Sequence, residues 1–320
     1  MLSFLVRRLI GGVLVCIGVT FLVFIIFIVA PGGGKLGTAE RIAGRTATNA
    51  NVLRIEHEWG FDRSLPTQYW IMMKKMFTGK LVSYTSQQNV LTQIKQGLPA
   101  TFSLTIGAGI IWLFFGILVG VISAITAGRW SDRLITVLAL IGISMPVFWL
   151  GIVMQLYFAS GGTLSIFPVG GYVPLMQNPV QWLYHLLLPW LVLAVLFIGF
   201  YGRVLRGNIL DTINEDFVRT ARAKGLSSRR VLVKHVLRSS LIPIVTLFGL
   251  DFASVLGGGA IVTERIFDLH GVGQYAAQSI RNFDLPPIMG VAMYGAFFIV
   301  AFSILVDLFY AYLDPRVRPT

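Results

Sequence analysis

The longest polar interval in the second half of this apolar sequence holds the charged side chains best spaced to act together. Two acids, Glu215 and Asp216, come first, and the bases Arg219, Arg222 and Lys224 follow. Acids early and bases late complement the dipole of a helix, so the pattern predicts a short helix with charges of both signs. The chemistry it suits is binding of a partner. A solvated connector whose charges only set membrane topology is an equally open alternative.

The predicted helix runs from residue 215 to residue 225. Asn214 is a good N-cap, and Gly225 can end the helix in the left-handed conformation. About ten residues at roughly 1.5 Å each give a rod about 15 Å long. Val218, Ala221 and Gly225 have i, i+3, i+7 spacing and form a small apolar face. A helix this short is marginal in water, so we expect this face to dock into a partner.

No other group of residues has the types and spacing that catalysis or metal binding requires. The four histidines stand in separate segments, at His57, His185, His235 and His270. No Gly-x-x-x-x-Gly-Lys-Ser/Thr phosphate loop occurs, since the glycines before Lys35 lack that spacing. We therefore expect no catalytic residue, no metal site and no cofactor in this chain.

The composition is that of an integral membrane protein. Of the 320 residues, 55% are hydrophobic and 12% are charged, whereas soluble domains carry about 25% charged residues. The mean hydropathy is +0.76. A net charge of +12 would suggest nucleic-acid binding in a soluble chain. Here the positive-inside rule explains the charge better, so we expect membrane lipid and no nucleic acid as a partner. The one cysteine, Cys16, excludes an intramolecular disulfide.

Six apolar stretches are long enough to cross a bilayer, which predicts an all-α membrane protein with six transmembrane helices. Arg7 and Arg8 precede the first stretch, which lacks a small-residue cleavage site and is expected to be a retained span rather than a signal peptide. Small residues recur in the second stretch and predict a closely packed core, with the first span peripheral. The stretches are Leu9–Ala30, Thr101–Ala127, Leu134–Ala159, Leu183–Tyr201, Leu241–Val262 and Ile288–Leu313, and the small residues are Gly107, Gly109, Gly116, Gly120 and Ala124.

The distribution of Lys and Arg predicts the side on which each loop lies. Six spans put both ends of the chain on one side, and 15 Lys and Arg residues fall there. Only 2 fall on the opposite side once the long 31–100 segment is set aside. We therefore expect cytoplasmic termini, with a cytoplasmic tail at 314–320 and an exterior segment at 31–100. In that segment Asn51–Trp59 and Pro66–Phe77 have helical periodicity. It is either a cap at the mouth of a pathway or a passive insertion.

Two places within the predicted spans are candidates for the lining of a pathway. Met145, Pro146 and Phe148 lie in the third span, where a proline frees backbone groups that protein or a wet cavity must satisfy. A proline used only for packing is the alternative. Asp251 lies near the centre of the fifth span, where an aspartate costs roughly 2.5–3.5 kcal/mol and should face protein or water. It could line the pathway or pair with a polar group of a partner subunit.

Two glycines beyond Asp251, Gly257 and Gly258, would weaken the fifth helix and allow a bend or close packing, so we include them among the pathway candidates. A second acid, Asp307, lies nearer the cytoplasmic end of the sixth span. We expect it to be structural.

The interval Arg-Thr-Ala-Arg-Ala-Lys-Gly-Leu at 219–226 resembles the cytoplasmic coupling loop of ATP-binding-cassette (ABC) importer permeases, and most closely that of the dipeptide, oligopeptide and nickel subgroup. Ala221 and Gly225 match the general importer pattern, whereas Arg219 and Thr220 replace its first Glu and Ala. Further motifs at 97–104, 264–273 and 306–316 extend the similarity along nearly the whole chain. His270 stands where the family usually has proline.

The resemblance implies the first of two membrane subunits of a peptide importer in the cell inner membrane. The implied partners are a second homologous permease, two ATPase subunits that bind ATP and Mg²⁺, and an extracytoplasmic solute-binding protein. The short helix would sit in a groove of the ATPase and move as a lever that reopens the pathway. The residues so assigned to ATPase coupling are Glu215, Phe217, Arg219, Thr220, Ala221, Arg222, Ala223, Lys224 and Gly225.

Other functions fit the sequence less well. Nickel, glutathione or another small solute is the alternative to a peptide substrate. An ATP-independent secondary transporter would favour an inverted repeat and several intramembrane charges. An intramembrane enzyme would need paired catalytic residues at matching depth. The sequence shows neither set of features.

Overall fold

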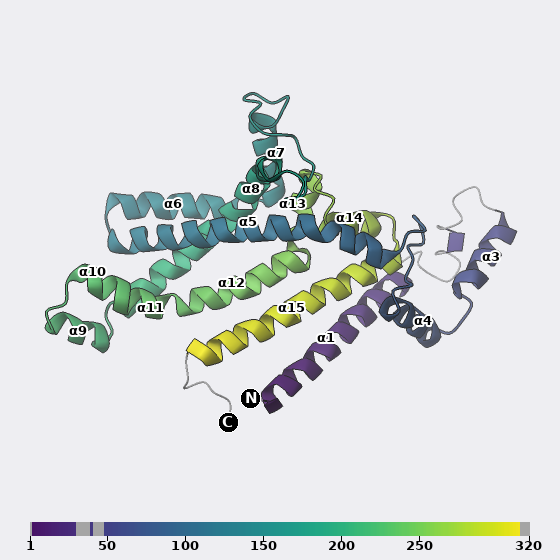
Figure 1. Ribbon diagram of the computed structural model, residues 1–320, viewed down its shortest axis with the longest axis horizontal. Helices are drawn as coiled ribbons and strands as arrows, with labels where there is room; N and C mark the ends of the chain where they lie inside the picture. Colours follow the sequence, from purple (N-terminus) through teal and green to yellow (C-terminus); the bar gives the residue numbers. More distant parts are fainter. Residues whose placement is uncertain (1, 30–38, 41–47, 314–320) are drawn as a thin grey trace.

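The chain folds into helices joined by turns and loops (Figure 1). The computed structural model describes residues 2–29, 39–40 and 48–313, and in these ranges it contains helices and two isolated β-bridges but no strand. This confirms the predicted all-α fold.

The helices follow the chain in an order that alternates long spans with short connecting elements. They are α1 Leu2–Val29, α3 Asn49–Trp59, α4 Leu65–Phe77, α5 Val90–Ile125, α6 Trp130–Ser144, α7 Val147–Phe158, α8 Pro179–Thr212, α9 Asp216–Ala223, α10 Ser228–Val231, α11 Leu237–Ser240, α12 Ile242–Ser254, α13 Ile261–Ile266, α14 Val272–Arg281 and α15 Leu285–Leu313, with π-helical turns η1 Leu232–Val236 and η2 Val255–Gly259.

Five helices in the described part of the chain are long and apolar enough to cross a membrane, and a bent pair makes up to six. The five candidate spans lie in α1, α5, α8, α12 with η2, and α15. Each overlaps one of the predicted stretches. Two helices begin well before the apolar stretch that predicted them. Helix α5 starts at Val90 and α8 at Pro179. Hydropathy therefore located the spans but not the helix ends.

The third predicted span differs from a straight crossing. Helix α6 ends at Ser144, α7 begins at Val147, and the two helices are bent by 101°. Pro146 cannot donate a backbone hydrogen bond, and it restricts Met145 to an extended conformation, with ψ at 122°. The predicted break is therefore confirmed. The hydropathy of the sequence did not predict this sharp change of direction.

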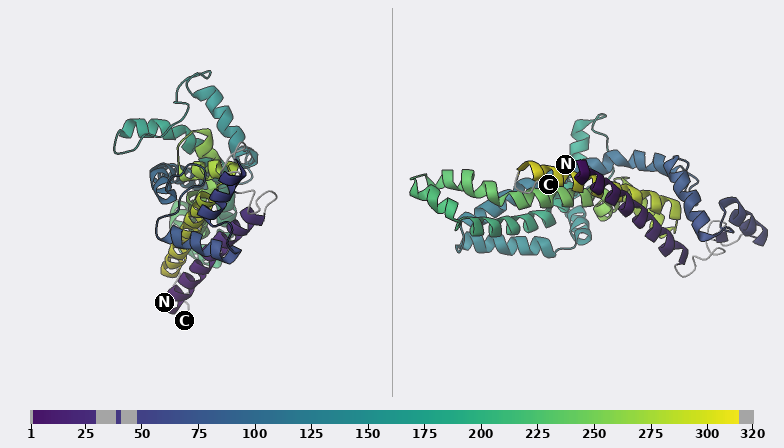
Figure 2. Two further views of the ribbon diagram at one scale, coloured as in Figure 1. Left: turned by 90° about the vertical axis from the view of Figure 1, so that its right-hand side faces the viewer. Right: turned by 90° about the horizontal axis from the view of Figure 1, so that it is seen from below.

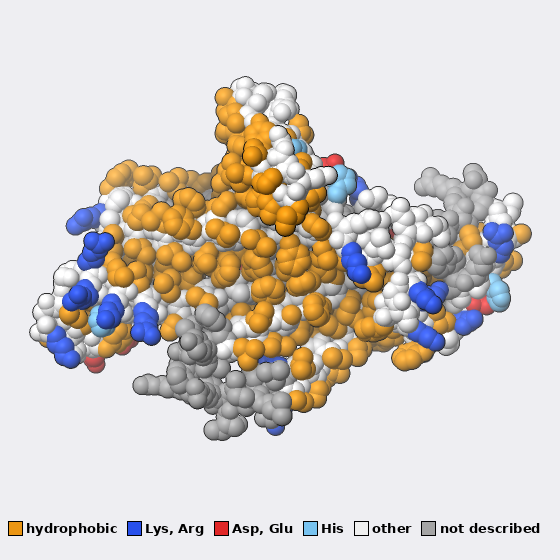
Figure 3. Space-filling view, in the orientation of Figure 1, with side chains coloured by type: hydrophobic (Ala, Val, Ile, Leu, Met, Phe, Trp, Pro, Cys, Tyr) orange, Lys and Arg blue, Asp and Glu red, His pale blue; other side chains and the backbone are white. Residues whose placement is uncertain are grey.

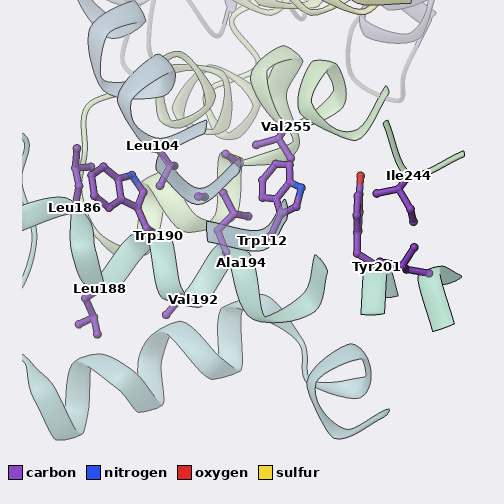
Figure 4. Packing of buried hydrophobic residues seen from close by; sticks show 14 of the residues in the cluster. Leu104, Trp112, Leu186, Leu188, Trp190, Val192, Ala194, Tyr201, Ile244 and Val255 are labelled. Atoms are coloured by element: carbon purple, nitrogen blue, oxygen red, sulfur yellow. The ribbon is translucent and has the colours of Figure 1, made fainter. Parts of the chain in front are cut away.

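Helices α5 and α8 form the centre of the structure and pack along most of their length. Glycines on α5 allow this contact, since a Cβ atom at Gly116 would lie 2.7 Å from Cβ of Tyr201, and one at Gly120 would lie 2.8 Å from Cβ of Leu205. Large side chains such as Trp112, Trp190 and Tyr201 fill the remaining space (Figure 4). The Trp112 ring stacks on that of Phe197, with ring centroids 4.4 Å apart. The predicted small face of the second span is the contact surface.

Helix α1 lies at the periphery, as predicted, and packs against α15. Arg8 of α1 forms an ion pair of 2.7 Å with Asp307 of α15. This contact between the two helices agrees with the structural role predicted for Asp307. The first turn of α1 and the last turn of α15 lie together in every view and point away from α3 and α4 (Figures 1 and 2). Both helices thus begin or end on one side of the molecule, as an even number of spans requires.

In its described residues, the segment between α1 and α5 contains helices α3 and α4, close to the predicted ranges. Residues 30–38 and 41–47 of the predicted exterior segment lie outside the described residues, as does the predicted tail at 314–320. The segment is fastened to the turn before α15 through Asp284, which is buried. Its carboxylate accepts hydrogen bonds from the backbone N–H of Tyr84, at 2.9 Å, and from the hydroxyls of Ser83 and Thr85.

Candidate functional site

Helix α9 occupies most of the predicted polar helix. It runs from Asp216 to Ala223, and Glu215, not Asn214, is the N-cap. The predicted cap was therefore wrong by one residue, and the side chain of Glu215 makes no capping hydrogen bond. Asp216 stands in the first turn, where the helix dipole favours it. Its contact with Arg219, at 3.4 Å, is exposed and contributes little.

The C-terminal end of α9 forms the motif that its sequence predicts. Gly225 has φ of +78°, in the left-handed region. The N–H of Gly225 bonds to the carbonyl of Arg222 at 2.9 Å, and the N–H of Leu226 bonds to that of Ala221 at 3.4 Å. These two bonds define a Schellman motif, which fixes the direction in which the chain leaves the helix.

The small face of α9 is not available to a partner. Val218 is 0% exposed and Ala221 is 5% exposed, and both belong to the main hydrophobic core of this chain. Helix α10 folds back against α9 and contributes the buried Val231. The expectation that this face docks into a partner was therefore wrong. The physical reason is that the residues after Gly225 supply the groove that the short helix needs.

The opposite face of α9 is exposed. Phe217 is 45% exposed, Thr220 and Lys224 share its side of the helix, and Ala223 is exposed as well. Exposed Lys and Arg side chains form a blue group at the end of the molecule occupied by α9–α11 and the turn between α5 and α6 (Figure 3). The exposed bases of 219–238 are Arg219, Arg222, Lys224, Arg229, Arg230, Lys234 and Arg238. An exposed aromatic side chain on a segment rich in exposed bases suits a protein surface that carries acids.

Both ends of this polar segment are joined to spanning helices. Asn208 of α8 donates a hydrogen bond to the carbonyl of Ser240 in α11 at 3.3 Å, and the Ser240 hydroxyl donates to the carbonyl of Asn208 at 3.2 Å. Helix α12 begins two residues after Ser240. A displacement of α9 can therefore reach α8 and α12 through short, hydrogen-bonded connections.

Asp251 lies in α12 and is held by a residue of α8. The hydroxyl of Tyr201 donates a hydrogen bond to Oδ2 of Asp251 at 2.7 Å. Tyr201 is 0% exposed, and the indole of Trp112, also 0% exposed, lies with its nitrogen edge turned toward it (Figure 4). Asp251 itself is only partly buried. Three helices thus orient one carboxylate within a candidate span.

The helix bends just beyond Asp251. The turn η2 replaces regular α-helix at Val255–Gly259, and Gly258 has φ of +132°, which a residue with a side chain rarely adopts. At Gly257 the turn lies so close to α15 that a Cβ atom would be 3.1 Å from the carbonyl oxygen of Gly295. The predicted bend and close packing at Gly257 and Gly258 are both present.

The candidates on the third span lie elsewhere. Met145, Pro146 and Phe148 line an open apolar groove of about 540 Å³ at the bend between α6 and α7. In Figure 1, α7 and α12 lie on opposite sides of α5. Within one chain the structure does not bring this bend together with Asp251, Gly257 and Gly258. The groove has no charged residue among those that line it, which are Leu140, Ile141, Ser144, Met145, Pro146, Phe148 and Trp149.

A buried carboxylate at Glu264 was not singled out from the sequence. It is 0% exposed in α13, and it accepts hydrogen bonds from the Thr101 hydroxyl at 2.7 Å and the Gln274 backbone N–H at 2.8 Å. A side chain at Gly271 would collide with it. Burial raises the pKa of the Glu264 carboxyl, and these hydrogen bonds oppose the rise. The available signal was an acid immediately after an apolar span, two residues beyond Val262.

Asp132 and Arg206 form an ion pair that was likewise not singled out from the sequence. Two hydrogen bonds of 2.8 Å join the Arg206 guanidinium to both carboxylate oxygens, and the Ser123 hydroxyl donates to the same carboxylate. The pair fastens the start of α6 to α8. Within the described ranges, no three His, Cys, Asp or Glu side chains come together as a potential metal site.

Comparison with known proteins identifies the family to which this sequence is similar. The family described as binding-protein-dependent transport system inner membrane component matches residues 116–319, and its N-terminal companion matches residues 1–105. The chain is 37% identical, over 99% of both chains, to a Brucella abortus protein provisionally named as a peptide transport system permease. It is 33% identical to the dipeptide transport system permease of Alkalihalophilus pseudofirmus, over 99% of this chain and 100% of that protein.

A glutathione transport system permease of Pectobacterium atrosepticum is also 33% identical, over 99% of both chains. Among solved structures, the methionine ABC transporter MetNI matches with a TM-score of 0.55 and 17% identity, over 70% of this chain and 97% of the MetNI chain. At that identity the likeness establishes the fold alone. The sequence matches cover the polar segment and every candidate span. This chain therefore belongs to the family of inner membrane components of binding-protein-dependent transport systems, as a multi-pass permease subunit.

Proposed function

We propose that this permease forms, with a second homologous permease subunit, the pathway by which an ABC importer carries dipeptides or oligopeptides across the inner membrane. The dipeptide and peptide names of the similar proteins support this substrate class. Glutathione, nickel or another small solute is the alternative substrate, and the similarity to a glutathione permease supports it. An extracytoplasmic solute-binding protein delivers the substrate.

Two separate ATPase subunits bind ATP and Mg²⁺ and carry out the hydrolysis, since this chain contains no phosphate loop. The chain contributes no catalytic residue of its own. The observation that carries the proposal is the exposed face of α9, where Phe217 stands among basic side chains on a segment tied to two spans. In this account α9 and its surroundings lie in the cytoplasm, as do both termini, and α3 and α4 lie outside.

The coupling mechanism follows from the packing of this segment. Because Val218 and Ala221 are buried against the chain's own core, α9 is held firmly against this end of the protein. Phe217, Thr220 and Lys224 face a groove in an ATPase. When ATP binding brings the ATPases together, the groove displaces α9, and the contacts between Asn208 and Ser240 carry the displacement to α8 and α12. The two conformations must grip α9 differently, as any ligand-driven shift requires.

The test is co-purification of the tagged chain from mild detergent, with identification of the proteins that accompany it. Recovery of an ATPase, a second six-span permease and a solute-binding protein would support the proposal, and the ligand of the binding protein would then name the substrate. A chain that purifies alone as a monomer, and transports solute in liposomes without ATP, would contradict it.

A further inference from the structure

One face of α12 carries small and polar residues within an apolar span. Asp251 and Ser254 are three residues apart in the regular helix α12, which places them on one side of it, and Gly258 follows in the irregular turn η2. Ser254 is exposed, and Asp251 and Gly258 are partly exposed. The neighbouring Phe252 turns instead into the protein, where its ring packs 5.2 Å from that of Phe302. We name Asp251, Ser254 and Gly258 the α12 polar face.

The carboxylate on this face is held in a fixed position. Its Oδ2 atom accepts the hydrogen bond from Tyr201, which is wholly buried against α5. Among the described residues, no other side chain or backbone group donates a hydrogen bond to this carboxylate, so Oδ1 has no donor there. A carboxylate oriented by a buried tyrosine, with one oxygen free, is arranged as a binding group would be.

No positive charge within the described part of the chain balances Asp251. The ion pairs there use other acids, namely Asp62, Asp132, Asp216, Asp268 and Asp307. An aspartate in the middle of a span does not face lipid without a large cost, so its further partner is water, a cation or a polar group of another subunit. Ser254, one helical turn from the carboxylate, is exposed and has a small side chain. The irregular backbone of η2 is of the kind that spanning helices adopt where they line a cavity.

We propose that Asp251 is a specificity-determining residue that binds the ammonium group of the transported solute, such as the free amino terminus of a short peptide, as it passes the α12 polar face. This inference rests on the proposed importer function and adds the chemical class that the pathway recognises. Tyr201 is its positioning residue, because it fixes Oδ2 and leaves Oδ1 toward the solute.

The first test measures the charge and water access at this face without reference to any substrate. Cys16 is the one cysteine, so Cys16→Ser provides a background in which Ser254→Cys can be labelled in the assembled, reconstituted complex. The rates of reaction with a cationic and an anionic methanethiosulfonate are compared with Asp251 intact and with Asp251→Asn. Residues three apart on a helix are about 5–6 Å apart. The ratio of the cationic to the anionic rate should therefore fall by about tenfold in Asp251→Asn.

A control defines the behaviour of a lipid-facing position. Leu14→Cys lies on the peripheral helix α1, where Leu14 is 63% exposed, and should react with neither charged reagent. Failure of Ser254→Cys to react from water would mean that the face contacts lipid or a partner subunit, and the inference would be wrong. A rate ratio unaffected by Asp251→Asn would also overturn it.

The second test uses labelled dialanine and N-acetyl-dialanine as probes of ATP-driven uptake by the complete complex. Asp251→Asn should lower the maximal uptake of dialanine about tenfold and leave that of the acetylated peptide unchanged, and Asp251→Glu should restore dialanine uptake. If the wild-type complex does not carry the acetylated peptide, the test is whether Asp251→Glu restores the dialanine uptake that Asp251→Asn lowers.

The outcomes separate the inference from the proposed function. Equal loss of both peptides in Asp251→Asn, or no loss, would overturn the binding role while the importer function stands. Uptake of neither peptide by the wild-type complex would contradict the peptide substrate, and the labelling experiment would then decide whether the face still binds cations.

Discussion

The Thr101 hydroxyl donates a hydrogen bond of 2.7 Å to Oε1 of Glu264, although 163 residues separate them in the sequence. The same threonine oxygen accepts the backbone N–H of Val272 at 2.9 Å, so α5, α13 and the start of α14 meet at one buried acid. This contact fixes the connection between α12 and α15 to the central helix pair.

The buried Glu264 predicts a pH dependence of stability. Its pKa in the folded protein is raised above the ordinary value of 4.5, so the folded state binds the proton more tightly than the unfolded state. The stability that protonation contributes is present below pH 4.5 and is lost as pH rises through the folded pKa. Glu264→Gln removes this titration. We expect the difference in unfolding free energy, wild type minus Glu264→Gln, to fall as pH rises from 4.5. Thermal unfolding in detergent measures it, and a difference that grows with pH would contradict the assignment.

The crossing of η2 and α15 predicts a strong effect of a single methyl group. A Cβ atom at Gly295 would lie 2.4 Å from the carbonyl oxygen of Gly257, so Gly295→Ala must push the two elements apart. Overpacking of this kind costs about 1–3 kcal/mol. Gly11→Ala on α1 is the matched control, since nothing lies within 4 Å of that site. We expect a lower melting temperature for Gly295→Ala only. Equal melting temperatures for the two variants would show that the crossing is loose.

The two faces of α9 predict opposite consequences for the same substitution. Ala221→Leu places a larger side chain in the chain's own core and should destabilise the permease by about 1–3 kcal/mol. Ala223→Leu lies on the exposed face and should leave the melting temperature unchanged while weakening the association with the ATPase subunits. Melting temperature and co-purification yield distinguish the two effects. The assignment of faces is wrong if Ala221→Leu leaves stability intact and Ala223→Leu unfolds the protein.

The end of α9 predicts the tolerance of position 225. Gly225 has φ of +78° with nothing within 4 Å of a built Cβ atom, so backbone strain and not crowding limits substitution. Gly225→Asn should retain uptake, because asparagine adopts the left-handed conformation readily. Gly225→Val should cost about 1–2 kcal/mol and move the chain that follows α9. Uptake per permease subunit measures the difference. A permease that tolerates valine as well as asparagine would show that the helix end is not constrained.

Local patterns predicted the features that depend on neighbouring residues. The apolar stretches located the spans, Pro146 marked the break in the third, and Gly225 marked the end of α9. The glycines of the second span lie where α8 and α12 pack against α5. Each of these follows from hydropathy or from a backbone restriction that acts within a few residues.

Tertiary contacts account for what the sequence could not predict. Helices α6 and α7 are bent by 101°, and α7 packs on α8 and α13, which follow later in the chain. The burial of Val218 depends on α10, which folds back on α9. The partner of Glu264 is contributed by a distant helix, and the orientation of Asp251 depends on Tyr201, 50 residues earlier. Periodicity within one segment carries no information about such pairs.

The measurement that tests the central claim most directly compares Phe217→Ala with Phe114→Ala in the reconstituted complex. Both side chains are exposed, at 45% and 61%, but Phe114 lies within the apolar span of α5. ATP-driven uptake of labelled dialanine and the ATPase rate are recorded together. If the exposed face of α9 couples the permease to its ATPase, Phe217→Ala should lower uptake per ATP hydrolysed by about tenfold or more, as loss of an aromatic interface anchor does. Phe114→Ala should leave it unchanged. Full uptake and normal ATPase association in Phe217→Ala would contradict the coupling role of α9.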